Sequence, residues 1–172
     1  MANLRGAVIG YGLAGSVFHA PLIASTPGLT VSTVVTSKPE RQAEAARAHP
    51  EARVVPDPGE VFERASEHDF VVVAAPNDVH LPLARRALDA GLPVVVDKPL
   101  APTAAEARPL AEHAEEVGLL LTVFLNRRWD SEQLTLRRLL DEQELGEVLR
   151  YESRLERWRP TLSEREAWRE AS

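Results

Sequence analysis

The stretch RGAVIGYGLAG, residues 5–15, decides the fold that this chain of 172 residues is expected to adopt. An apolar run leads directly into the spacing GxGxxG, formed by Gly10, Tyr11, Gly12, Leu13, Ala14 and Gly15. Between a strand and a helix, the first glycine permits a tight turn, the second lets the main chain approach a pyrophosphate, and the third lets the helix pack closely. These six residues are therefore predicted to bind a dinucleotide. An ordinary glycine-rich turn is the alternative.

Short apolar runs alternate with helical patterns along residues 1–125. Strands are expected at 5–9, 29–36, 53–55, 69–74, 93–96 and 119–125, and helices at 14–24, 39–48, from 57, at 78–90 and at 103–118. Continuous Val-rich runs are typical of strands that are covered on both faces. Six strands alternating with helices predict an α/β protein with a doubly wound parallel sheet, the NAD(P)-binding Rossmann fold.

The chain changes character after residue 125, where charged residues become frequent. A helix is expected at 131–141 with Leu134, Leu139 and Leu140 facing inward, and an alternating pattern at 146–155 predicts a half-exposed strand. We therefore expect two domains: a nucleotide-binding domain at 1–125 and, at 126–172, a connecting helix and the first strand of an incomplete C-terminal α/β domain.

Composition excludes several functions. The net charge of −6 argues against nucleic-acid binding, and the absence of cysteine excludes a thiol nucleophile or a thiolate metal site. The histidines lack metal-ligand spacing, so no metal is expected. Short apolar runs and the lack of a signal-peptide pattern predict a cytoplasmic protein with no membrane partner. Of 20 cationic residues only Lys38 and Lys98 are lysines, and each calls for a chemical explanation.

Ser37 and Lys38 follow the second predicted strand, where an NAD-specific domain usually has an acid for the ribose 2′-hydroxyl. No acid occurs there before Glu40. A hydroxyl and a cation would instead bind the 2′-phosphate of NADP, so NADP(H) is expected to be preferred, with NAD(H) also accepted. The alternative is that Ser37 and Glu40 form a capping box for the next helix.

More candidates follow the fourth predicted strand, because the carboxyl ends of parallel strands face the ligand in this fold. Ala75, Pro76, Asn77 and His80 are expected at the cofactor. Asn77 or Asp78 could instead cap the next helix, and His80 could be structural rather than catalytic.

The sequence Asp97-Lys98-Pro99 follows the fifth predicted strand. Pro99 favours an extended backbone at Lys98, which would direct the ammonium into the cleft, with Asp97 holding it by charge. There Lys98 could hydrogen-bond a substrate hydroxyl and relay its proton during hydride transfer. Lys98 is thus the predicted catalytic residue and, with Asp97, part of the cofactor site. A surface ion pair of little energetic value is the alternative.

After the sixth predicted strand, Asn126 and Arg128 are expected to form a polar wall against the nicotinamide, with Trp129 as an apolar anchor. Solvated charge at a domain boundary is the alternative.

Four motifs in this order carry a family resemblance: GYGLAGSVFHAPLI (10–23), PNDVH (76–80), DKPL (97–100) and NRRWD (126–130). They resemble the glucose-fructose oxidoreductase / inositol dehydrogenase / MocA (Gfo/Idh/MocA) family, and within it the scyllo-inositol-dehydrogenase-like members. The resemblance implies an NAD(P)-dependent oxidoreductase that acts on a sugar or cyclitol hydroxyl. The lysine of the family's Glu-Lys-Pro motif corresponds to Lys98, and Asp97 stands in place of the glutamate.

The resemblance also implies a C-terminal substrate domain that completes the catalytic group, of which only the opening is expected here, and a homo-oligomer formed through that domain. The 172-residue chain is therefore expected to bind cofactor without turning over substrate. Two other functions stay open. A non-catalytic dinucleotide-binding module, such as a redox sensor or a regulatory subunit, would need no proton relay at Lys98. An interaction domain without ligand is disfavoured by the intact GxGxxG.

Overall fold

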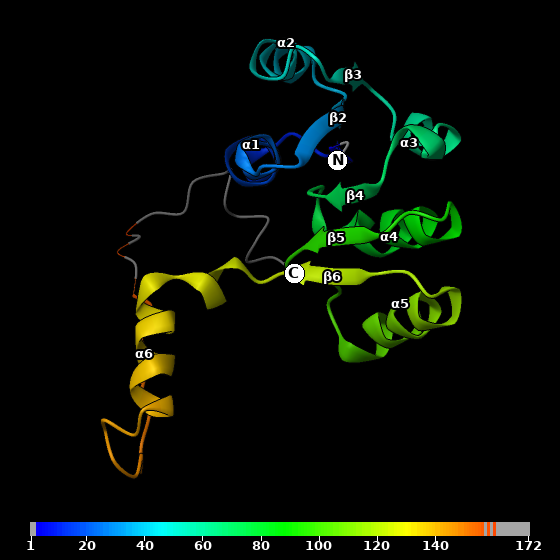
Figure 1. The fold of residues 1–172 in the computed structure, drawn as a ribbon. Coiled ribbons are helices and arrows are strands. Elements are labelled where there is room, and N and C mark those ends of the chain that lie inside the picture. The colour runs from blue at the N-terminus through cyan, green and yellow to red at the C-terminus, as the bar shows by residue number, and fades with distance from the viewer. Residues whose placement is uncertain (1–2, 157, 159, 161–172) are drawn as a thin grey trace. The chain divides into compact units, whose positions relative to one another are not determined.

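A computed structural model describes residues 3–156, 158 and 160 of the chain. The chain forms two compact units, Met1–Asn126 and Arg127–Ser172. The first unit contains one parallel sheet of six strands in the order β3-β2-β1-β4-β5-β6 (Figure 1). The strands are β1 (Leu4–Ile9), β2 (Leu29–Val35), β3 (Arg53–Val55), β4 (Phe70–Val73), β5 (Val94–Asp97) and β6 (Leu121–Phe124). The predicted doubly wound parallel sheet is confirmed, and its order reverses between β1 and β4.

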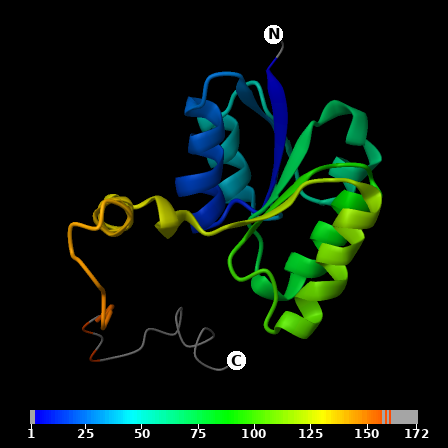
Figure 2. The ribbon, with the colours of Figure 1, turned by 60° about the horizontal axis from the view of Figure 1, so that its bottom comes forward.

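Helices cover both faces of this sheet (Figures 1 and 2). One face carries a π-helical turn, η1 (Ala14–His19), followed by α1 (Ala20–Ser25) and α2 (Pro39–Ala48). The other face carries α3 (Gly59–Glu63), α4 (His80–Asp89) and α5 (Ala104–Val117), with the 3-10 turns η2 (Ala65–Glu67) and η3 (Asn77–Val79). None of the helices that the structure describes has the length and apolar character needed to cross a membrane.

The side chains of β4 show how the sheet forms two apolar cores. Val72 belongs to the core that contains Ala20 and Ala45, from α1 and α2. Val71 and Val73 belong to the core on the opposite face, which α3, α4 and α5 cover. Successive valines therefore point to opposite faces and are buried on both, which explains why the strands read as continuous apolar runs.

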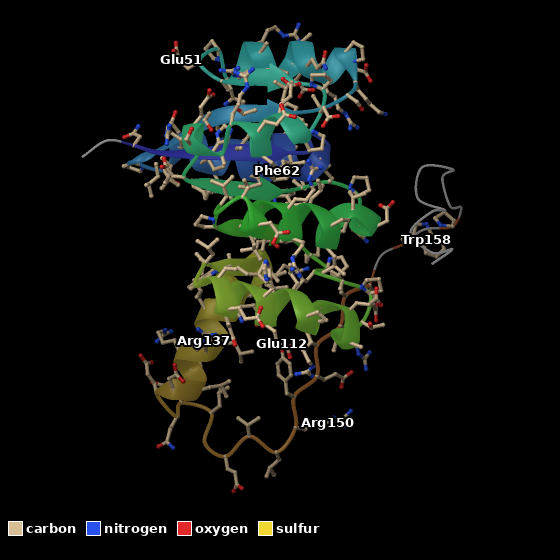
Figure 3. The ribbon with its side chains drawn as sticks, turned by 90° about the vertical axis from the view of Figure 1, so that its right-hand side faces the viewer. Glu51, Phe62, Glu112, Arg137, Arg150 and Trp158 are labelled. Carbon is tan, nitrogen blue, oxygen red and sulfur yellow. The ribbon has the colours of Figure 1, made fainter. Side chains whose placement is uncertain are left out.

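A contact between side chains joins α3 and α4 on the face of the sheet that these helices cover. The guanidinium of Arg86 lies over the ring of Phe62, 4.5 Å from its centroid, and Figure 3 labels Phe62 on α3. In the same view the two ends of the unit are marked by Glu51, which precedes β3, and by Glu112 on α5. The contact between Arg86 and Phe62 is a cation–π interaction that joins α4 to α3.

Helix boundaries differ from the prediction where local turns compete. The helix expected at 14–24 begins as the π-helical turn η1, in which the amide of Ala20 donates to the carbonyl of Gly15. The helix expected from Asp57 begins at Gly59, whose amide donates to the Asp57 carboxylate at 2.5 Å. In α5 the predicted cap is present, because Thr103 accepts the amide of Glu106 at 3.3 Å.

The second unit contains α6 (Ser131–Asp141), as predicted, preceded by the 3-10 turn η4 (Asn126–Trp129). No residue of α6 is buried, and Leu134 and Leu140, predicted to face inward, are each 42% exposed. The strand predicted at 146–155 is not present either. A strand needs a hydrogen-bonding neighbour and an apolar helix face needs a cover, and the described part of this unit provides neither. Residues 161–172 of the predicted second domain lie outside the described residues.

Candidate functional site

Two glycines of the turn after β1 are required by close main-chain packing. Gly10 has φ +101°, and a Cβ there would collide with the carbonyl of Ala74, at the end of β4. A Cβ on Gly15 would collide with the carbonyl oxygen of Gly10. These contacts hold the start of η1 against the glycine turn, at the point between β1 and β4 where the strand order reverses and such sheets place ligands.

Gly12 differs from its two neighbours in the motif. The nearest atom that a Cβ on Gly12 would meet is Nη1 of Arg41, at 3.7 Å, and the φ of Gly12 lies outside the left-handed region. The fold therefore does not require a glycine at position 12. A side chain at position 12 would instead extend into open space beside the amides at the start of the helix. A pyrophosphate would be bound in this space.

The other residues of the motif contribute unequally. Tyr11 is 3% exposed, and its ring packs edge-on against His49 at a centroid distance of 6.2 Å. Burial and, second, the charge of Glu44 raise the pKa of the Tyr11 hydroxyl. Because its side chain is buried, Tyr11 can offer a ligand only its main chain. Leu13 is exposed and Ala14 is half-buried at the helix start.

The segment after β2 brings one cation, Arg41, to the glycine turn. Lys38 is the residue that precedes α2, and no side chain caps this helix, so the capping box of Ser37 and Glu40, the alternative explanation of these residues, is absent. One helical turn later, Arg41 lies beside Gly12. Within the described chain, no salt bridge engages Lys38 or Arg41. Sequence reasoning missed Arg41, although it lies in the first turn of the helix that follows Lys38.

The end of β4 combines an exposed loop with a buried histidine. Pro76, Asn77 and Asp78 are exposed. Neither η3 nor α4 has a side-chain cap, so the alternative in which Asn77 or Asp78 caps the helix is not supported. His80, expected at the cofactor, is 1% exposed. Its Nε2 lies 2.9 Å from the carbonyl oxygen of Ala75, a residue that is itself half-buried. The His80 side chain therefore faces main chain rather than a ligand.

At the end of β5 the side chain of Lys98 is exposed. The Asp97 carboxylate accepts the main-chain amide of Lys98 at 2.8 Å and forms no salt bridge with its ammonium. The expectation that Asp97 holds the ammonium by charge is thus wrong, because the shorter aspartate reaches its neighbour's backbone instead. The ammonium remains available at the carboxyl edge of the sheet.

His19, which the sequence analysis did not single out, is buried beside the ends of β5 and β6. It is 4% exposed, its ring lies 4.3 Å from that of Phe124, and its Nε2 has no hydrogen-bond partner among the described residues. Burial lowers the pKa of His19, although the nearby Asp97 carboxylate acts in the opposite direction. The apolar surroundings therefore favour a neutral ring.

The residues after β6 are divided between the two units. Asn126 is half-buried in the first unit, whereas Arg128 and Trp129 belong to the second unit, where Trp129 is 68% exposed. The polar wall predicted from Asn126 and Arg128 stays a prediction.

Burial of three histidines predicts how stability depends on pH. Burial is the largest cause of the lowered pKa of His19, His49 and His68. The unfolded chain, with ordinary histidine pKa values of about 6.5, then binds more protons as pH falls. The free energy of unfolding should be greatest above about pH 7 and fall as pH drops below about 6.5. The hydrogen bond from Arg5 lowers the pKa of Asp69, and this carboxylate changes the free energy of unfolding only at more acidic pH.

Urea unfolding at pH values on either side of this window measures the effect. The matched variant His19→Phe removes one of the three groups and should flatten the dependence. A free energy of unfolding that rises toward acid in the same window would contradict the prediction.

Comparisons with known proteins agree with this geometry. A family model described as "Oxidoreductase family, NAD-binding Rossmann fold" matches residues 4–125. "Uncharacterized oxidoreductase YdgJ" of Escherichia coli is 47% identical over 168 residues, which are 98% of this chain and 47% of that protein. "Scyllo-inositol 2-dehydrogenase (NADP(+)) IolW" of Bacillus subtilis is 36% identical over 98% of this chain and 45% of its own length.

Solved structures show the same fold. The YPO2259 protein of Yersinia pestis is 44% identical and superposes with a TM-score of 0.80, over 92% of this chain and 46% of that one. Scyllo-inositol dehydrogenase of Lactobacillus casei, with bound NAD(H) and scyllo-inositol, has a TM-score of 0.76 at 21% identity, over 84% of this chain and 42% of that one, a likeness of fold alone. The chain spans about half the length of the curated relatives it matches.

Proposed function

The chain belongs to the Gfo/Idh/MocA oxidoreductase family, and on this premise we propose that it binds a nicotinamide dinucleotide above Gly12. The enzyme that it serves would transfer hydride between the nicotinamide and a hydroxyl-bearing or keto carbon of a cyclitol or sugar. The observation that carries the proposal is the open space at Gly12, between two glycines that the packing fixes. Titration with reduced cofactor tests it.

Each part of the edge has a separate task in this proposal. The main chain at Gly12 and the amides at the start of η1 hold the phosphates. When bound, the nicotinamide supplies the hydride chemistry. In oxidation of the alcohol, the exposed side chain of Lys98 acts as a neutral amine and accepts the proton of the substrate hydroxyl. In reduction of the ketone, the ammonium so formed donates this proton back to the substrate oxygen. Asp97 fixes the main chain of Lys98 through the amide that it accepts.

We further propose that NADP(H) is preferred over NAD(H). Support comes from the cations Lys38 and Arg41, neither of which has a salt-bridge partner among the described residues. It also comes from the absence of an acid between the end of β2 and Glu40. The hydroxyl of Ser37, which caps no helix, adds a donor for a 2′-phosphate. The name of the IolW relative, which specifies NADP(+), agrees with this choice.

Reversing the charge at Arg41 should change cofactor preference. In Arg41→Glu a phosphate partner becomes an anion, so NADPH affinity should fall by about 10- to 100-fold, as expected for losing a hydrogen bond to a charged group. NADH affinity should change much less. The matched control is Arg47→Glu, an equal charge change on an exposed residue about 9 Å further along α2. Fluorescence titrations with both cofactors measure the ratio, and equal losses for NADPH and NADH would remove Arg41 from 2′-phosphate recognition.

The substrate class rests on the relatives named for scyllo-inositol and inositol. A cyclitol is therefore the first substrate to test, followed by sugars with a free secondary hydroxyl. Self-association of the enzyme stays a prediction, which light scattering of the purified protein would test.

A further inference from the structure

We propose that His80 is the positioning residue for Lys98. Its buried imidazole joins the main chain that carries Lys98 to the main chain that supports the glycine turn. The inference rests on the proposed function for the role of Lys98. At 1% exposure His80 reaches no ligand, so any part that it has in the reaction is indirect.

The two nitrogens of His80 lie against carbonyl oxygens from two different loops. Nδ1 is 2.7 Å from the carbonyl oxygen of Pro99, and Nε2 is 2.9 Å from that of Ala75. Pro99 directly follows Lys98 after β5. Ala75 follows β4, and a Cβ on Gly10 would lie 2.9 Å from its amide nitrogen. Because β4 and β5 are neighbours in the sheet, one ring connects the loop behind the glycine turn with the loop of Lys98.

Donor and acceptor chemistry explains why a side chain with an N–H is needed at position 80. A carbonyl oxygen can only accept a hydrogen bond, so each contact needs an N–H on the ring. A neutral imidazole supplies one N–H and an imidazolium supplies two. At least one loop is therefore held in either protonation state. Because the ring itself is 1% exposed, no water replaces it from the ring side, and removing its donor is expected to cost about one net hydrogen bond.

The consequence for Lys98 is geometric. Its own amide is held by the adjacent Asp97, a contact within the same loop, whereas the contact between His80 and Pro99 attaches that loop to α4. Releasing Pro99 would let Lys98 change position at the edge of the sheet. A displacement of about 1 Å at a reacting group can lower a rate by about 100-fold. His80 would thus affect turnover more than it affects cofactor binding.

Native-state hydrogen exchange of the chain without cofactor tests this connection directly. In His80→Phe, which keeps an aromatic ring but has no donor, the Lys98 amide should exchange about tenfold faster, which corresponds to the loss of one net hydrogen bond. In His80→Gln, which keeps a side-chain N–H, the exchange rate of the Lys98 amide should lie between the rates in His80→Phe and in the parent chain. Amides in the middle of β5 should keep their parental rates.

The matched control is His68→Phe. His68 is also buried, at 5% exposure, and its Nδ1 lies 2.9 Å from the Ser32 hydroxyl, but it precedes β4 and so lies at the opposite end of that strand. A general loss of stability would speed exchange at Lys98 in both phenylalanine variants. The proposal requires the effect in the His80 variants alone. An unchanged Lys98 amide in a folded His80 variant, or an equal change in His68→Phe, would overturn it.

A second readout separates this inference from the proposed function. In the active enzyme, His80→Phe should lower kcat at least about tenfold while the NADPH dissociation constant changes little. The exchange result does not depend on cofactor. Failure of the parent chain to bind NADPH would therefore remove the proposed function, whereas failure of the exchange experiment would remove only the connection through His80.

Discussion

Replacing Gly12 with valine is expected to weaken NADPH binding by about 100-fold or more, equivalent to about 2.8 kcal/mol, while the domain still folds. The side chain would occupy the open space above the turn, where the pyrophosphate would lie. Folding should survive because the φ of Gly12 suits an L-residue and the nearest atom belongs to the flexible end of Arg41. Fluorescence titration measures affinity, and urea unfolding measures stability in the same preparation.

Gly15→Ala is the matched control for Gly12→Val. A Cβ at Gly15 would collide with the main-chain carbonyl of Gly10, so this smaller substitution should destabilise the domain by about 1–3 kcal/mol, as overpacking does. The account therefore predicts opposite profiles: lost binding with retained stability at position 12, and lost stability at position 15. If Gly12→Val bound NADPH as tightly as the parent, the glycine turn would not be the phosphate site.

Removing the amine of Lys98 is expected to have the largest effect on turnover. In the active enzyme, Lys98→Ala should lower kcat by about 10²- to 10⁴-fold, the usual contribution of a placed acid–base group. Lys98→Arg should be almost as slow, because a guanidinium keeps the charge but does not release its proton. Steady-state assays with a panel of cyclitols and sugars, followed by the absorbance of the reduced nicotinamide, provide the measurement.

The NADPH dissociation constant of each Lys98 variant, measured in parallel, separates binding from chemistry. Full activity in Lys98→Arg would leave only an electrostatic role for this residue. Full activity in Lys98→Ala would remove it from the mechanism and favour the alternative in which the domain binds a dinucleotide without catalysis.

Most helices and strands of the first unit could be predicted, because their sequence patterns are local. The continuous valines of β4 and β5, the GxGxxG turn and the cap at Thr103 are each encoded within a few residues, so the sheet, its helices and the position of the turn could be read from the sequence. The strand predicted at 146–155 was wrong for the converse reason. Its pattern is local, but a strand forms only with a partner, which the described part of that unit does not contain.

Contacts between distant residues could not be predicted. The burial of Tyr11 against His49, the approach of Arg41 to Gly12 and the attachment of His80 to Pro99 all depend on how the elements pack. A histidine at a helix start has the same sequence signature whether it faces a ligand or a carbonyl oxygen. The sequence therefore located the strand ends that form the candidate site, but not which of their side chains point toward it.

The central claim, that the edge formed by the ends of β1, β2 and β4 holds a nicotinamide dinucleotide, is tested most directly by titrating the parent chain with NADPH and NADH and following the fluorescence of the reduced nicotinamide. The account predicts saturable binding of one cofactor molecule per chain, with NADPH bound more tightly than NADH. Tighter binding of NADH would contradict the assignment of Ser37, Lys38 and Arg41 to a 2′-phosphate. The absence of saturable binding for both cofactors would contradict the site itself.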